Sequence, residues 1–122
     1  MKYLLLLSII FNLSFGDTFN PPRKEPKQLI FERAVMYALG TNVPRDERRA
    51  FHLFHKAARQ GHLEATYLVG VSFDQGRGVR VQKELARYWF KLAAKRGHAQ
   101  ASFRLSSLNR KLFSQPRRYA RR

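Results

Sequence analysis

The sequence predicts an all-α protein, an α-solenoid built from about two and a half helix-turn-helix repeats. Internal repetition is the first observation: AARQG at residues 57–61 returns as AAKRG at residues 93–97, an offset of 36 residues (97 − 61). A period of this length is typical of stacked hairpins. The second observation is that each unit carries helix-ending residues twice and shows no strand-like alternation. We therefore expect five helices whose apolar faces are buried by stacking.

The first 16 residues form a separate segment. One lysine is followed by an unbroken apolar run at residues 3–15, with small residues before a cut between Gly16 and Asp17. This composition is typical of a secretory signal peptide, and the run is shorter than the roughly 20 residues needed to span a bilayer. Residues 1–16 are predicted to be a cleaved signal peptide of a secreted or periplasmic protein, without a transmembrane segment after cleavage. A retained membrane anchor is the alternative.

Residues 17–27 contain three prolines and are expected to form an extended linker. The repeat region is then predicted to cover residues 28–113. Its first helix should run from about residue 28 to residue 39 and end at Gly40, because glycine readily adopts the left-handed conformation that closes a helix.

A second helix is expected to begin near Pro44 and to end at Gly61. Asp46 and Glu47 are expected in its first turn, where the helix dipole favours negative charge.

The second hairpin repeats this plan, with helices over about residues 63–75 and 82–96. A fifth helix, over about residues 99–113, is expected to cap the stack, because terminal repeats must shield the last core face. Residues 114–122 are rich in arginine and contain Pro116, which predicts a basic, disordered tail.

The stretch from Ala65 to Ala101 resembles the Sel-one-like repeat (SLR) family, which is related to the tetratricopeptide repeats. Residues 29–62 match the same pattern more loosely, and Gln82 stands where the family usually has aspartate. The resemblance implies an α-solenoid used for protein contacts. The matching positions are Ala65, Val69, Gly70, Phe73, Gly76, Gly78, Val79, Ala86, Trp89, Phe90, Ala93, Ala94 and Gly97.

A row of aromatic residues is the candidate partner-binding surface. At 100° per residue, Phe31, Tyr67 and Phe103 occupy the same side of the first, third and fifth helices, away from the expected core. In similar solenoids this side lines the concave surface where partner peptides bind, and Val35 and Val71 extend it. The alternative is that these side chains pack between adjacent repeats.

The charge is strongly positive, with 24 Lys and Arg against 8 Asp and Glu and a net charge of +16. This imbalance indicates partners rather than fold. The expected anionic partners are nucleic acid, lipopolysaccharide, anionic lipid, acidic polysaccharide or an acidic protein. The alternative to an anion-binding surface is a solvated exterior whose charges repel each other. The candidate anion-binding residues are Lys83, Arg87, Lys91 and Lys95 on the convex face and Arg117, Arg118, Arg121 and Arg122 in the tail.

Catalytic and metal-binding patterns are weak in this sequence. Cysteine is absent, and no hydrolase or metalloprotease motif occurs. His52 and His55 lie three residues apart but lack an evident third ligand. We therefore predict a non-enzymatic protein-protein interaction adaptor with no cofactor, metal or small-molecule substrate. A polyanion binder is the alternative, and an enzyme acting on cell-wall material is a third class that no group of residues supports.

Overall fold

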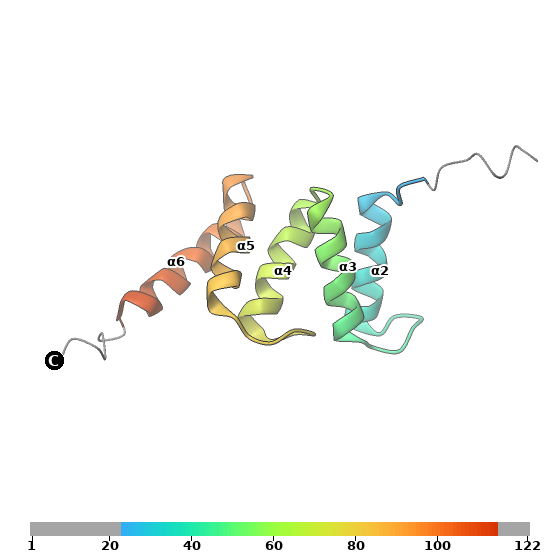
Figure 1. Cartoon of the computed structure of the whole chain (residues 1–122), viewed down its shortest axis with the longest axis horizontal. Helices are drawn as coiled ribbons and strands as arrows, with labels where there is room; N and C mark the ends of the chain where they lie inside the picture. Colours follow the sequence, from blue (N-terminus) through green and yellow to red (C-terminus); the bar gives the residue numbers. More distant parts are fainter. Residues whose placement is uncertain (1–22, 115–122) are drawn as a thin grey trace, which may run out of the picture.

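The computed structural model describes residues 23–114, which form five α-helices arranged in a row in chain order (Figure 1). Within this range there is no β-strand, so the all-α prediction is confirmed. The predicted signal peptide, its cleavage site and residues 115–122 of the predicted tail lie outside the described residues. Ser114, predicted to begin the tail, is instead the last residue of the fifth helix. The helices are α2 (Lys27–Leu39), α3 (Glu47–Arg59), α4 (Leu63–Gln75), α5 (Lys83–Lys95) and α6 (Ala99–Ser114).

Each helix packs mainly against the helices before and after it in the chain. The pairs α2–α3 and α4–α5 are the two predicted hairpins, and α3–α4 and α5–α6 contacts join them into a stack. α4 lies between α3 and α5 and is buried on almost every side, whereas α2 buries only Ile30 and Ala34 fully. The core therefore centres on α4.

The predicted helix ends agree closely with the structure. Gly40 and Gly76 adopt left-handed conformations, with φ of 74° and 73°, and their N–H groups donate to the carbonyls of Met36 and Ser72. Glycine suits these positions because side chains with a Cβ disfavour positive φ. The 36-residue repeat thus recurs in the backbone as well as in the sequence.

The start of the second helix differs from the prediction. α3 begins at Glu47, and Pro44 lies before it rather than at its first turn. Asp46 is the N-cap, where its carboxylate accepts a hydrogen bond from the backbone N–H of Arg49 at 2.9 Å. Glu47 does lie in the first turn.

Small side chains permit close packing between helices. Ala57 and Ala93, equivalent in the two repeats, are fully buried. A Cβ placed on Gly70 would lie 2.7 Å from the ring of Phe90, so the absence of a side chain on α4 makes room for the largest fully buried residue of α5.

The linker prediction is corrected at its C-terminal end. Lys27 belongs to α2, and Glu25 is held against the repeats by ion pairs to Arg33 at 2.6 Å and Lys56 at 3.2 Å. These partners lie on α2 and α3. Residues 23–26 are therefore non-helical but attached to the stack.

The exposed side of α6 carries serine side chains together with Phe103 and Phe113. Ser102 and Ser106 are exposed at the positions that correspond to Thr66 and Gly70, both buried on α4. Ala101 and Leu108 of α6 are buried. This pattern fits a terminal helix that covers α5 and presents polar groups to water. Over residues 23–114, none of the helices combines the length and the hydropathy that crossing a bilayer requires.

Candidate functional site

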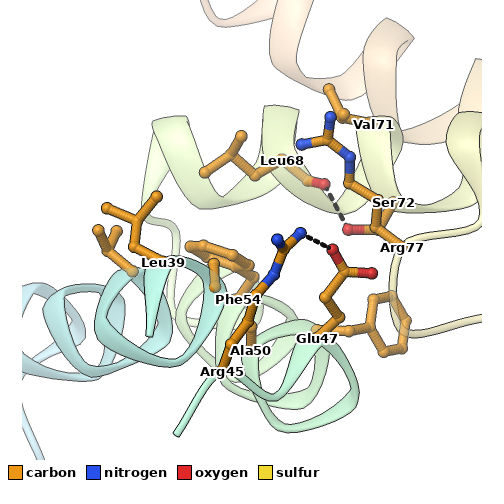
Figure 2. Close-up of a pocket in the computed structure, with 12 residues that line it drawn as sticks. Leu39, Arg45, Glu47, Ala50, Phe54, Leu68, Val71, Ser72 and Arg77 are labelled. Carbon is orange, nitrogen blue, oxygen red and sulfur yellow. Dashed lines mark hydrogen bonds and ion pairs between the residues drawn. The ribbon is translucent and has the colours of Figure 1, made fainter. Parts of the chain in front are cut away.

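A pocket of about 370 Å³ opens between the first hairpin and α4 (Figure 2). Ala50 and Phe54 of α3 are buried at its base. Leu39, at the end of α2, is 70% exposed and forms part of its edge. The other apolar lining residues are Val35 and Ala38 of α2, Phe51 of α3, and Leu68 and Val71 of α4.

Polar groups gather at one end of this pocket, where the two long interhelical loops meet it. Arg45 comes from the loop before α3 and Arg77 from the loop after α4. Arg45 donates to the carboxylate of Glu47 at 2.5 Å, and Ser72 donates its hydroxyl to the carbonyl of Leu68 at 2.9 Å (Figure 2). The pocket therefore combines an apolar interior with guanidinium groups beside it, and Arg77 has no ion pair among residues 23–114.

The equivalent place in the second repeat has a different character. At the 36-residue offset, Ala38 corresponds to Asp74, Glu47 to Lys83, and Leu68 to Arg104. Asp74 pairs with Lys83 at 2.6 Å and with Arg104 at 4.0 Å. Ion-paired side chains thus occupy positions of the second repeat whose equivalents line the pocket in the first repeat.

Two of the three residues in the predicted aromatic row, Phe31 and Tyr67, do not form an exposed surface. Tyr67 is only 8% exposed, and its ring stacks on that of His98 with centroids 4.4 Å apart. Phe31 is partly buried and stacks on His62 at 4.2 Å. The alternative, packing between adjacent repeats, therefore describes both residues. Phe103 is 73% exposed, but it is not among the residues that line the pocket.

Two of the five predicted partner-binding residues do reach the pocket. Val35 is partly buried and Val71 is 7% exposed, and both side chains line the cavity. Leu39 lies on the same side of its helix as Phe31 and Val35 in the sequence pattern, but sequence reasoning missed Leu68 and Arg77. A position-by-position comparison of the repeats contains the missing signal, because Leu68 is apolar where its equivalent, Arg104, is charged.

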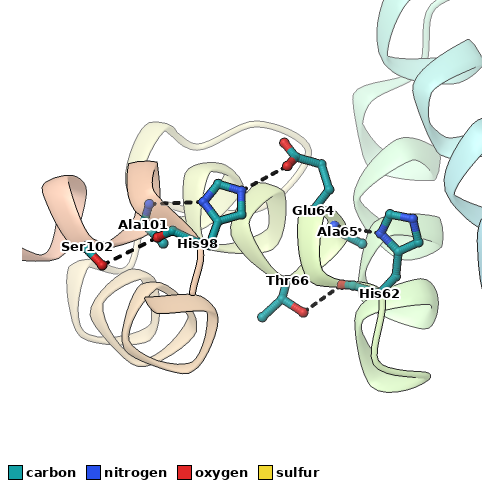
Figure 3. A network of polar contacts seen from close by, with 7 residues as sticks. All are labelled: His62, Glu64, Ala65, Thr66, His98, Ala101 and Ser102. Carbon is teal, nitrogen blue, oxygen red and sulfur yellow. Dashed lines mark hydrogen bonds and ion pairs between the residues drawn. The ribbon is translucent and has the colours of Figure 1, made fainter. Parts of the chain in front are cut away.

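The two histidines that recur between hairpins hold the start of the following helix (Figure 3). Nδ1 of His62 accepts from the N–H of Ala65 at 3.1 Å, and Nδ1 of His98 accepts from Ala101 at 3.2 Å. Their Nε2 atoms lie 3.0 Å from Oε1 of Gln28 and 2.9 Å from Oε2 of Glu64, respectively. Since Nδ1 acts as acceptor, each neutral ring carries its proton on Nε2 and donates it to the preceding repeat.

The environment of His62 disfavours its charged form. Burial lowers the pKa of His62 below its ordinary value, and the nearby Lys27 lowers it further, while Glu64 acts in the opposite direction. The neutral ring is the form that can accept the capping hydrogen bond. The histidine is therefore a structural element of the repeat junction.

The predicted convex basic stripe is partly neutralised. Lys83 pairs with Asp74, and Arg87 pairs with Glu84 at 2.6 Å. Lys91 and Lys95 are exposed, and neither has an ion pair within residues 23–114. The four predicted tail residues, Arg117, Arg118, Arg121 and Arg122, lie outside the described part of the chain.

Metal binding has no further support in the described residues. Between residues 23 and 114, no three or more His, Cys, Asp or Glu side chains are grouped so that they could hold a metal ion.

The profile described as Sel1 repeat matches residues 30–62 and 63–98, which are the two hairpins with their connections. The chain belongs to the Sel1 repeat family. The family assignment confirms the resemblance seen in the sequence, including the divergent first unit.

Solved Sel1 repeat structures share the fold. A Sel1 repeat protein from Oxalobacter formigenes is 32% identical, with a TM-score of 0.65 over 66% of this chain and 61% of that one. The protective antigen c5321 of uropathogenic Escherichia coli, which displays an SLR fold, is also 32% identical, with a TM-score of 0.60 over 62% of this chain and 16% of that one.

Curated relatives include two fungal proteins. Chitin synthase regulatory factor 4 of Schizosaccharomyces pombe is 37% identical over 80 residues, and chitin synthase regulator SKT5 of Saccharomyces cerevisiae is 30% identical over 69 residues. These matches cover 65% and 57% of the Sel1 repeat chain. The chain spans only 12% and 10% of the lengths of these two relatives.

Proposed function

We propose that this Sel1 repeat protein is a non-enzymatic interaction module that binds a short apolar segment of a partner protein. The pocket between α2, α3 and α4 carries the proposal. Its volume of about 370 Å³ lies within the range of roughly 300–1,000 Å³ typical of ligand pockets. An exposed apolar rim around a preformed hollow is a common site for an anchoring side chain.

The chemistry of the pocket narrows the partner segment. Its interior suits a bulky aliphatic or aromatic side chain. Arg77, which has no ion pair within residues 23–114, favours a carboxylate close by, whereas Arg45 is already paired with Glu47. The net charge of +16 also favours an acidic partner over a basic one. The names of the fungal relatives, regulators of chitin synthase, are consistent with a role in contacts between proteins.

Peptide selection with matched variants tests this proposal. Random peptides captured by the wild-type chain should be enriched in a bulky apolar residue next to Asp or Glu. Leu68→Arg introduces into the first repeat the residue present at the equivalent position of the second, Arg104, and should reduce binding of the selected peptides at least tenfold.

Leu29→Arg is the matched control. It adds the same charge at an exposed leucine of α2 that does not line the pocket, and it should leave peptide binding unchanged. If the selected peptides bind the Leu68→Arg variant as tightly as the wild type, the pocket is ruled out as the peptide-binding site.

A polyanion is the second candidate partner, favoured by the exposed Lys91 and Lys95 and the overall charge. Salt distinguishes the candidates, because displacement of counterions from a polyanion makes its binding fall steeply with added salt, whereas burial of an apolar anchor does not. In both proposals the module is secreted or periplasmic, which depends on the composition of residues 1–16 alone.

A further inference from the structure

A second hollow, of about 320 Å³, lies on the outer side of α3, away from the apolar pocket. We call it the α3 basic pocket, and its lining residues are Lys24, His52, His55, Lys56, Arg59 and Gln60. None of the six is a carboxylate. His52, His55, Lys56 and Arg59 have the spacing i, i+3, i+4 and i+7, which places them on one face of the helix. Lys24 joins them from the segment before α2.

The pocket concentrates hydrogen-bond donors of like charge. Lys24, Lys56 and Arg59 are cationic, and Gln60 supplies an amide. Burial lowers the pKa of His55, and the nearby Arg59 and then His52 lower it further. Like charges at this spacing repel one another, and a bound anion would reduce this repulsion.

Nearby acidic groups neutralise only part of this charge. Glu25 accepts from Lys56 at 3.2 Å, but it also pairs with Arg33 at 2.6 Å, and these two hydrogen bonds lower the pKa of its carboxyl. From α5, the group in contact with His55 is the uncharged ring of Trp89, edge-on at 5.4 Å. Lys24, Arg59 and the two imidazoles form no ion pair within residues 23–114.

We propose that the α3 basic pocket binds a tetrahedral oxyanion, a phosphate or sulfate group. Such a group presents acceptor oxygens in several directions and matches donors that come from one helix face and from Lys24 on another segment. Arginine and lysine are the usual ligands of these groups, and a protonated imidazole adds a further charged donor. A single carboxylate would leave several of these donors without an acceptor.

Trp89 reports on this pocket, since it is the chain's only tryptophan and it touches His55. Sulfate is the probe because it remains a dianion from about pH 6 to pH 8, where histidine titrates. Titration at fixed ionic strength, with chloride replaced by sulfate, should change Trp89 fluorescence in a saturable way. Sulfate should bind at least about threefold more tightly at pH 6 than at pH 8, because the anion favours the protonated imidazoles.

Matched variants distinguish sulfate binding in the α3 basic pocket from sulfate binding to diffuse surface charge. Arg59→Gln should weaken sulfate binding about two- to fivefold at both pH values, as expected for the loss of one exposed ionic contact. His52→Gln combined with His55→Gln should remove the pH dependence, measured by calorimetry because His55 contacts the reporter. Lys91→Gln removes an exposed charge outside the pocket and should leave sulfate binding unchanged.

The source of the oxyanion is tested with two further probes, inorganic phosphate and vesicles that contain phosphatidic acid. Phosphate binding that Arg59→Gln weakens supports a free ion, and vesicle binding that the same variant weakens supports a lipid headgroup. The proposal is overturned if sulfate and chloride give the same response and no phosphate or vesicle binding depends on Arg59. Equal losses in Lys91→Gln and Arg59→Gln would also overturn it.

Discussion

At the scale of single residues, Gly78 shows how closely the loop after α4 approaches α3. A Cβ built on Gly78 would lie 2.0 Å from the carbonyl oxygen of Glu47, and its φ is +70°. Gly97 also has a positive φ, +89°, but a Cβ there would meet nothing within 4 Å. The two glycines therefore share a backbone requirement and differ in the space around them.

This pair gives a prediction. Gly97→Ala should cost about 1–2 kcal/mol of the free energy of unfolding, the price of a left-handed conformation for a residue with a Cβ. Gly78→Ala should cost roughly 4 kcal/mol or more, because the loop must also move away from α3. Urea denaturation of both variants measures the difference, and equal costs would contradict the close approach.

Single residues were also the level at which the sequence was least informative. Tyr67 and Val71 fall opposite the expected core on a helical wheel, yet both are buried. A wheel treats a helix as having one buried side, but α4 packs between α3 and α5 and has nearly none exposed. The stacking of Tyr67 on His98 joins α4 to the residue that precedes α6, which spacing within one helix cannot reveal.

At the scale of helices, α3 and α5 start with nearly the same backbone but different caps. Asp46 has φ −145° and ψ 96°, and Gln82 has φ −143° and ψ 97°. Asp46 accepts the N–H of Arg49, whereas no side-chain hydrogen bond caps α5. The longer glutamine side chain is a poor N-cap, since short polar side chains reach the N–H groups of the first turn best.

Gln82→Asp should therefore stabilise the protein. The aspartate can accept the N–H of Leu85, three residues on, and we expect a gain of about 0.5–1 kcal/mol. For a domain of this size, that gain raises the melting temperature by roughly 2–8 °C. Gln82→Ala is the control and should give no gain, and an unchanged melting temperature for Gln82→Asp would show that the cap does not form.

Helices were the level at which the sequence was most informative. Glycines at 40, 61, 76 and 97 and the 36-residue period were enough to locate all five helices described. The start of α3 was placed too early because Pro44 is compatible with a first helical turn and equally with the loop before it. The cap at Asp46 became clear only from its hydrogen bond to Arg49.

At the scale of the whole molecule, two histidines link stability to pH. The pKa values of His55 and His62 are both lowered from 6.5 in the folded protein, in each case mainly by burial. Below pH 6.5 the unfolded chain binds more protons at these positions than the folded chain does, so the free energy of unfolding falls as the pH falls. Stability from these histidines is fully present above pH 6.5.

The melting temperature should therefore decrease when the pH is lowered from about 7 to about 5. His55→Gln combined with His62→Gln should flatten this dependence while lowering stability at pH 7, because the cap of α4 is lost. The pKa of Glu25 is lowered from its ordinary value of 4.5, so this carboxylate adds a separate loss of stability below pH 4.5. A melting temperature that stays constant from pH 7 to pH 5 in the wild type would contradict the lowered pKa values of His55 and His62.

The neighbour-to-neighbour packing of α2 through α6 also bears on how the molecule acquires its shape. Almost all contacts join helices that are adjacent in the chain, so forming them does not require the closure of long loops. Either hairpin can nucleate, and assembly can then propagate along the row in both directions. Such low contact order predicts rapid folding, on the microsecond to millisecond timescale of small helical proteins.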